Sequence, residues 1–304
     1  MRIVIFGANG QVGRAVFSAV KKQFPVAEIL ACVRKTHLHF EGVAGDHHQR
    51  SIVFDPLRDD LKTPGKTDVL INCIGAIDES QVKFETTHVL PLLRITDAFE
   101  SLGRPLLIQV SALGASPVAS AAFFRTKALA EKLALRLPRA VVVRPSIVCT
   151  SGTMLVRRLQ SLQRLGRFTG KKIFVPERFL QTKLQPVTGR DLAALIARIA
   201  AGENCPRSVD AVGPDTITVA DLIGIAGLRA VPVSQRFSDF AWKTVHPLLK
   251  KWISSEQYEL LKQDNCSDVK AMEKIMQRMP GSTIPFWEEE LAVSAKKKAE
   301  LVFA

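Results

Sequence analysis

The chain has 304 residues, of which 47% are hydrophobic and 23% charged. This composition excludes a disordered chain, because so much apolar material collapses and buries itself. No window approaches the roughly 18–20 uninterrupted apolar residues that a membrane-crossing helix needs, so a membrane-spanning protein is not expected. Since a domain takes roughly 100–200 residues, the length fits one large domain or a main domain with an appendage.

The net charge is strongly positive, because 42 Lys and Arg against 29 Asp and Glu give +13. This charge fits a solvated basic surface, and it also fits attraction to anionic lipid headgroups, an acidic protein partner or a phosphorylated ligand. Nucleic acid is not expected as a partner, because the basic residues are dispersed, Tyr258 is the only tyrosine and no reader motif occurs.

The N-terminus and the cysteines predict a cytoplasmic location. The first residues, MRIVIFGANG, run directly into a strand and a turn, with no signal core and no transit helix. The five cysteines are odd in number, widely spaced and without a CxxC pair: Cys32, Cys73, Cys149, Cys205 and Cys266. We therefore expect reduced thiols rather than a disulfide framework or a zinc site.

Short apolar strands alternate with helical stretches through the first half, which is typical of a parallel sheet covered by helices. We expect strands at Arg2–Phe6, Glu28–Val33, Ser51–Phe54, Asp68–Cys73, Leu106–Ala112 and Ala140–Pro145, and helices at about 11–23, 81–102 and 119–137. The pattern predicts an α/β fold with a doubly wound parallel sheet of the Rossmann type.

After Pro145 the pattern loosens, and we expect a smaller C-terminal α/β lobe. The sequence predicts helices at 155–165, 189–201 and 218–227, a hairpin near 171–175 and a strand at 208–213. We accordingly divide the chain into a Rossmann core (1–150), a smaller lobe with elements that return to the core (151–230) and a helical C-terminal extension (231–304).

A glycine-rich turn carries the strongest functional signal. The sequence GANGQVG lies between the first strand and the first helix, and it supplies the candidate cofactor-binding residues Gly7, Asn9, Gly10, Gln11, Val12 and Gly13. Glycines allow a tight turn, a close approach of backbone to a pyrophosphate and close helix–strand packing, while the helix N-terminus offers N–H groups to the phosphates. Because the strand and helix context is present, we expect nucleotide binding.

The residues after the second strand favour NADP(H) over NAD(H). An acid there would accept the ribose hydroxyls of NAD, but this sequence has Arg34 and Lys35, which suit a 2′-phosphate. Arg14, just after Gly13, would add positive charge on the same side of the cofactor. Two further segments are expected at the cofactor. Asp55, at the end of the third strand, is placed to meet the adenine ring, and the backbone of Cys73, Ile74 and Gly75, at the end of the fourth strand, is expected to approach the cofactor closely.

These motifs resemble those of the atypical, extended short-chain dehydrogenase/reductases, which are similar to NAD-dependent epimerases and dehydratases. More narrowly, the chain resembles the bacterial relatives of the nucleotide-binding accessory subunit of mitochondrial complex I. The matching pieces are GANGQVG, NCIGA, HVLPLL at His88, VSALGAS from Val110, FFRTKALAEK, VVVRPSIV, LQPVTGRDLA and ISSEQYELLKQDN, spread over roughly residues 1–270. The resemblance adds Lys127 and Pro145 to the expected cofactor-binding residues.

One catalytic group of the resembled family is absent. Its active enzymes use a Tyr-x-x-x-Lys pair, in which the lysine lowers the tyrosine pKa and holds the nicotinamide ribose while the phenol exchanges a proton. Lys127 matches the lysine and Ser111 matches the substrate-orienting serine, but Phe123 stands at the tyrosine position. Phe cannot transfer a proton, and general acid–base help is worth roughly 10²–10⁴ in rate.

Two functions follow. One is an NADP(H)-binding protein that uses the nucleotide structurally or in a quinone or respiratory context, as the resemblance to the complex I subunit implies. The other is an active NAD(P)-dependent reductase or epimerase, acting on a small or isoprenoid-like substrate with a relocated general acid. Asp78 and Glu79 are the nearest replacements, although loop carboxylates are more often simply solvated.

Two further clusters remain. His37, His39, His47 and His48 lie within twelve residues, but in a Gly-containing polar loop that lacks the fixed geometry of a metal site, so no metal is expected. The basic C-terminal segment around 237–252 interleaves aromatic residues with lysines. It fits either a helix packed over the substrate cleft or a peripheral contact with a membrane or a protein.

Overall fold

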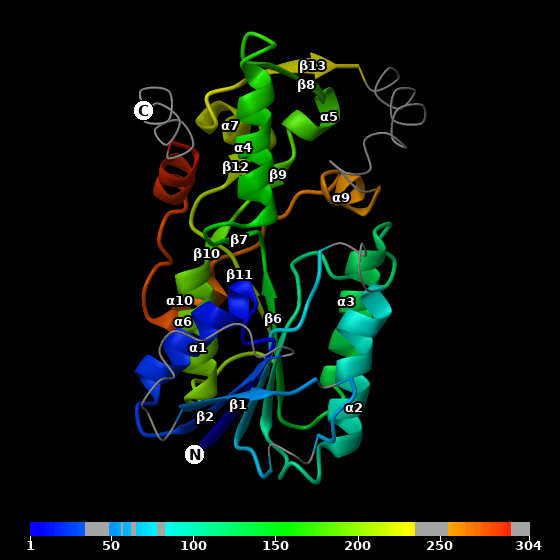
Figure 1. Ribbon diagram of the computed structural model, residues 1–304, viewed down its shortest axis with the longest axis vertical. Coiled ribbons are helices and arrows are strands. Elements are labelled where there is room, and N and C mark those ends of the chain that lie inside the picture. The colour runs from blue at the N-terminus through cyan, green and yellow to red at the C-terminus, as the bar shows by residue number, and fades with distance from the viewer. Residues whose placement is uncertain (34–48, 56, 62–64, 78–82, 235–254, 293–304) are drawn as a thin grey trace.

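The computed structural model describes residues 1–33, 49–55, 57–61, 65–77, 83–234 and 255–292 (Figure 1). Its centre is a seven-stranded sheet in the order β11-β6-β5-β4-β1-β2-β3, in which every pairing is parallel. The strands are β1 (Arg2–Phe6), β2 (Glu28–Val33), β3 (Gln49–Val53), β4 (Val69–Asn72), β5 (Leu106–Val110), β6 (Ala140–Pro145) and β11 (Ser208–Ala211).

Helices cover both faces of this sheet (Figure 1). Because successive side chains of a strand point to opposite faces, Ile3 and Ile5 of β1 are buried with residues of α1 (Gln11–Gln23), α6 (Gly189–Ala200) and α10 (Lys270–Met276). Val4 and Phe6 are buried with residues of α2 (Leu90–Ala98) and α3 (Ala122–Ala134) on the other face. The predicted doubly wound Rossmann fold is confirmed, and the apolar run that follows Arg2 in β1 is explained by burial on both sides.

The predicted helix at 81–102 differs from the structure. A π-helical turn, η1 (Glu85–Val89), leads into α2, which ends at Ala98. Pro91 lies in the first turn of α2 and has no N–H to donate to a carbonyl of the preceding turn, so the chain widens there instead of continuing as a regular α-helix. This wider turn carries His88, which reappears at the candidate site.

Beyond the end of β6 the chain forms a smaller lobe, drawn above the sheet in Figure 1. Its elements are α4 (Met154–Gly166), α5 (Glu177–Leu180), α7 (Val219–Ile225), α9 (Ser255–Leu260) and the strand pairs β7 (Val148–Cys149) with β10 (Val187–Thr188), β9 (Lys183–Leu184) with β12 (Ile217–Thr218), and β8 (Lys172–Pro176) with β13 (Arg229–Val233). Side chains of α4, α5, α7, β7, β8, β9 and β12 form a separate buried cluster with Trp287. From this half of the chain, α6 and β11 return to the Rossmann sheet.

The predicted hairpin near 171–175 is wrong. Only one strand forms there, β8, and its partner is β13, which lies far along the chain and runs parallel to it. A parallel pair needs a long crossover connection rather than a tight turn. The turn before β8 instead joins that strand to α4.

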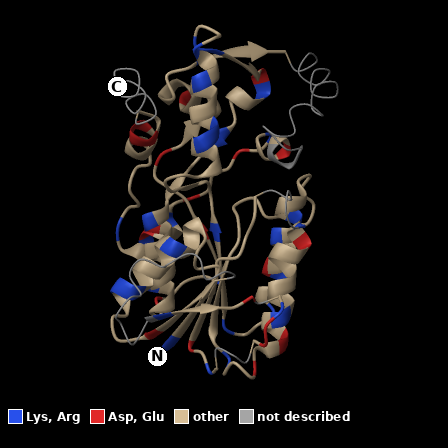
Figure 2. Ribbon diagram, in the orientation of Figure 1, with Lys and Arg blue, Asp and Glu red and all other residues tan. Residues whose placement is uncertain are grey.

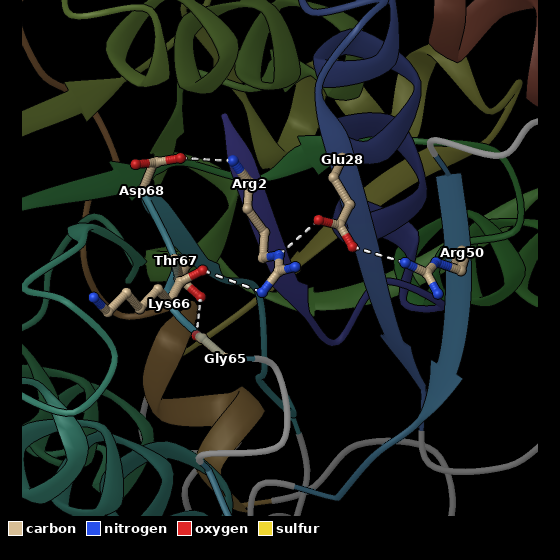
Figure 3. Close-up of polar contacts among 7 residues, drawn as sticks. All are labelled: Arg2, Glu28, Arg50, Gly65, Lys66, Thr67 and Asp68. Carbon is tan, nitrogen blue, oxygen red and sulfur yellow. Dashed lines mark hydrogen bonds and ion pairs between the residues drawn. The ribbon is translucent and has the colours of Figure 1, made fainter.

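Charged side chains join the first three strands at the amino-terminal edge of the sheet (Figure 3). Glu28 of β2 accepts hydrogen bonds from Arg2 of β1 at 2.7 Å and from Arg50 of β3 at 2.9 Å, while the backbone N–H of Arg2 donates to Asp68 at 2.7 Å. The hydrogen bond and charge of Arg2, then those of Arg50, hold the pKa of Glu28 below its ordinary 4.5.

We expect Glu28→Gln to lower the free energy of unfolding at neutral pH by about 1 kcal/mol or less, since all three side chains are partly exposed. A carboxyl whose pKa is depressed in the folded state stabilises the protein above its unfolded pKa. The difference between wild type and variant therefore shrinks as the pH falls below 4.5, through the depressed folded pKa. Urea titrations across this range measure it. Glu100→Gln, which removes a far more exposed pair with Arg104, should leave stability unchanged at every pH.

Candidate functional site

The glycine turn after β1 has the geometry that its sequence predicts. Gly7 has a φ of +70°, and its carbonyl accepts the N–H of Gly10 at 3.0 Å. A Cβ built on Gly13 would lie 2.1 Å from the carbonyl oxygen of Gly7. Only glycine fits there, because no side chain atom approaches a backbone oxygen so closely. The turn thus brings the start of α1 directly onto the end of β1.

The same turn lies against the end of β4. A Cβ on Gly7 would come within 3.1 Å of the carbonyl carbon of Cys73 and the nitrogen of Ile74. The side chain of Asn72 is buried, donates to Gln109 at 2.8 Å and accepts the N–H of Ile74 at 3.2 Å. These bonds hold the backbone after β4 beside the glycine turn, so two segments that sequence analysis assigned to the cofactor do meet.

The N-terminus of α1 is open to an anion. Its N-cap residue is Gly10, which offers no side-chain cap, and no acidic residue lies in its first turn. Gln11 is exposed and Val12 half-buried. The exposed Arg14 folds back, with its Nε donating to the carbonyl of Asn9 at 3.1 Å, so it supports the turn from outside. Backbone N–H groups at a helix N-terminus bind phosphate well.

Lys127 of α3 reaches this region from the other side. Its side chain is buried, its Nζ donates to the carbonyl of Val110 at 3.3 Å, and a Cβ on Gly75 would lie 3.1 Å from the same Nζ. Burial lowers the pKa of Lys127 to about 8, against smaller opposite effects of Cys73 and Glu131. Gly75 is exposed, so the lysine borders the segment that follows β4.

Phe123, one turn before Lys127, lies in a cluster of aromatic rings. Its ring stands edge-on to Phe84, His88 and Phe124, with centroids 5.8, 5.5 and 5.4 Å away. Phe84 and His88 are stacked at 5.3 Å. Edge-to-face packing of this kind stabilises the rings. Phe123 is therefore held by ring contacts, one of them with an imidazole.

His88 is a neutral imidazole within that cluster. Its Nδ1 lies 2.9 Å from the hydroxyl of Thr126, which also lies 3.0 Å from two backbone carbonyls of its own helix. Its Nε2 lies 3.2 Å from the backbone nitrogen of Ala76 and 3.1 Å from the carbonyl oxygen of the same residue. Burial, followed by the nearby charge of Lys127, lowers the pKa of His88 to about 3. Near neutral pH this imidazole has no excess proton to donate.

Ser111 is engaged in a buried ionic network. Its hydroxyl donates to Glu131 at 2.6 Å, and the same carboxylate accepts two hydrogen bonds from Arg144 of β6, at 2.8 and 2.6 Å. The side chain of Glu131 is 5% exposed. Sequence reasoning missed Glu131, although its position four residues after Lys127, on the same helix face, was the available signal. Pro145 is buried at the end of β6, next to Arg144.

Other expected residues lie apart or outside the described chain. Asp55 is half-buried, and its carboxylate accepts the backbone N–H of Leu57 at 3.0 Å. Tyr258 is buried against Phe179 in the smaller lobe. Outside the described residues lie Arg34, Lys35, Asp78, Glu79, His37, His39, His47 and His48, and most of the basic C-terminal segment.

The described residues contain no group of three or more His, Cys, Asp or Glu side chains that could hold a metal ion. Within the same ranges, no helix has the length and apolar character needed to cross a bilayer.

Solved structures with this fold bind dinucleotides or act on nucleotide sugars. A nucleoside-diphosphate-sugar epimerase from Staphylococcus aureus matches 95% of this chain and all of its own, with a TM-score of 0.71 and 15% identity. An NADPH-dependent quinone oxidoreductase from Escherichia coli, solved with NADPH, matches 95% of this chain and 98% of its own, at 0.69 and 17%. These likenesses show that the chain has the same overall fold as these two enzymes.

Comparison of the sequence with those of known proteins identifies a relative of the chain. None of the known protein-family models matches the chain. It is 31% identical over 237 residues to the mitochondrial NADH dehydrogenase [ubiquinone] 1 alpha subcomplex subunit 9 of Arabidopsis thaliana, a match that covers 73% of this chain and 56% of that subunit. The chain thus spans just over half of this relative. In sequence it is similar to this complex I subunit, as its motifs predicted, and it shares its fold with the epimerase and the quinone oxidoreductase.

We expect Gly13→Ala to destabilise the protein by about 1–3 kcal/mol or more, because the added methyl group overlaps the carbonyl of Gly7. Gly10→Ala is the matched control, since its Cβ would lie 3.2 Å from the same oxygen and needs a shift of only a few tenths of an ångström. Thermal unfolding of both variants measures the difference. Equal melting temperatures would show that the close approach at Gly13 does not constrain the turn.

Proposed function

We propose that this protein binds NADP(H) and uses the nucleotide to stabilise its fold or an assembly, in a quinone or respiratory context, rather than to reduce a substrate. One observation carries the proposal. The close-packed glycine turn and the buried Lys127 occur together with Phe123, whose ring packs among other rings and carries no exchangeable proton.

The residues present fit a dinucleotide. The uncapped N-terminus of α1, the turn at Gly7 and the backbone after β4 form a cradle that extra Cβ atoms would fill. Gly7, Asn9, Gly10, Gln11, Val12 and Gly13 would hold the pyrophosphate, and Cys73, Ile74, Gly75, Lys127 and Pro145 would border the rest, with Lys127 on a ribose. When bound, the nucleotide would supply a nicotinamide able to carry hydride.

The described groups around Phe123 do not replace the missing proton donor. The ring of Phe123 cannot exchange a proton, the imidazole of His88 is neutral, and the hydroxyl of Ser111 donates to Glu131. A reductase that worked through this position would lack general acid help worth roughly 10²–10⁴ in rate. These three observations favour binding without turnover over an active reductase or epimerase.

The respiratory context rests on the homologue. Its name assigns it to NADH dehydrogenase [ubiquinone] of mitochondria, and one solved structure of the same fold is a quinone oxidoreductase. We propose that this chain likewise contacts respiratory or quinone-handling machinery, as a cytoplasmic protein peripheral to a membrane.

We expect NADPH to raise the melting temperature by several degrees, since a ligand at a thousand times its Kd stabilises the folded state by about 4 kcal/mol. NADPH absorbance should stay constant in the presence of carbonyl compounds and quinones. Lys127→Met should lose the thermal shift while folding at least as stably as wild type, because the methionine removes a buried ammonium. Oxidation of NADPH above the protein-free rate would contradict the proposal and favour an enzyme with a relocated acid.

The preference for NADP(H) is tested at Arg34 and Lys35. We expect Arg34→Asp to weaken NADPH binding by about tenfold or more and to leave NADH binding nearly unchanged, because a guanidinium pairs with the 2′-phosphate that only NADPH carries. Isothermal titration with both nucleotides measures the two constants. An equal loss for both nucleotides would mean that Arg34 does not contact the 2′-phosphate.

A further inference from the structure

Exposed aromatic rings and cations gather at the far end of the smaller lobe. Phe168 is 89% exposed and Phe174 is 68% exposed, and Leu165 beside them is 49% exposed. Figure 2 shows Lys and Arg over the end of α4 and the start of β8. We name this surface the α4–β8 tip and define it by Arg164, Leu165, Arg167, Phe168, Lys171, Lys172, Phe174 and Arg229, all of them exposed.

We propose that the α4–β8 tip docks on a membrane surface of anionic phospholipids. This surface lies apart from the glycine turn, and the proposal does not depend on nucleotide binding.

The charge of the tip lacks compensation within the described chain. From Met154 to Pro176 the sequence contains no Asp or Glu. None of the tip's cations takes part in the ion pairs of the described residues. Lys172 and Arg229 are register partners on β8 and β13. Like charges directly opposite one another repel, and an anionic surface relieves that repulsion.

The rings are presented on a well-ordered turn. Gly170 and Lys171 have φ values of +59° and +63°, and the N–H of Lys171 donates to the carbonyl of Gly166 at 2.6 Å. The hydroxyl of Thr169 donates to the carbonyl of Lys172 at 2.6 Å. Beneath the turn, Gly166 packs against Leu228, so that a Cβ there would lie 2.5 Å from it. The ring of Phe168 is therefore already exposed, and it can contact a partner without any rearrangement of the backbone.

This combination fits a lipid interface better than another polyanion. Phe174 and Val231 are register partners and add apolar surface beside the charges. Phe and other apolar side chains enter the boundary between headgroups and acyl chains, while Lys and Arg meet the phosphates.

Vesicle flotation of the full chain tests the proposal. We expect wild type to float with vesicles of phosphatidylcholine and phosphatidylglycerol and not with phosphatidylcholine alone, and to be released by salt. Phe168→Ser with Phe174→Ser should weaken binding by about tenfold or more, since both substitutions remove apolar surface that the bilayer would bury. Lys171→Gln with Lys172→Gln should weaken binding to the anionic vesicles several-fold.

Matched controls lie on the Rossmann lobe. Val26→Ser alters a residue that is 83% exposed, and Lys22→Gln with Lys132→Gln removes two exposed cations; neither should change flotation. Unchanged binding of the tip variants would overturn the proposal and assign the membrane contact to other residues. Wild type that binds heparin but no vesicle would overturn it as well, in favour of a soluble polyanion.

Discussion

The close approach of the glycine turn to its neighbours is the constraint on which the rest of this structure depends. Gly13 touches the carbonyl of Gly7, and Gly7 in turn lies against the backbone after β4. These two contacts fix where α1 begins and how far β1 and β4 extend. Because ligands of doubly wound sheets bind at the carboxyl ends of the strands, the same contacts decide the shape of the proposed nucleotide cradle.

A second set of interactions joins that cradle to the smaller lobe. Arg144 holds Glu131 and lies opposite Asp210 in the pairing of β6 with β11, and Asp210 accepts the hydroxyl of Ser267 at 2.6 Å. Two residues earlier, the side chain of Asn265 accepts the hydroxyl of Ser146 and donates to a carbonyl after β5. The chain that follows α9 is thus fixed to the ends of β5 and β6 by hydrogen bonds.

Local pattern determined what could be predicted from the sequence. The apolar run at β1, the helical period of α1 and the glycine spacing each depend on neighbours in the chain, and each was predicted correctly. The pairing of β8 with β13 depends on residues far apart, and no local pattern encodes it. Two features lie between these cases. Pro91 is visible in the sequence, but the π turn before it is not, and the spacing of Glu131 from Lys127 is visible, but its bonds to Ser111 and Arg144 depend on the tertiary structure.

The buried lysine connects stability to function. Glu131, the acid four residues after Lys127, is already bonded to Ser111 and Arg144, so Lys127 gains only a weak Coulomb attraction from it. Its hydrogen bond to Val110 is long, at 3.3 Å, and burial lowers the pKa of the ammonium to about 8. An apolar side chain of similar size would stabilise the empty site. The fold therefore bears a cost that a ribose hydroxyl would offset. This favours the proposed binding of a nucleotide beside Lys127.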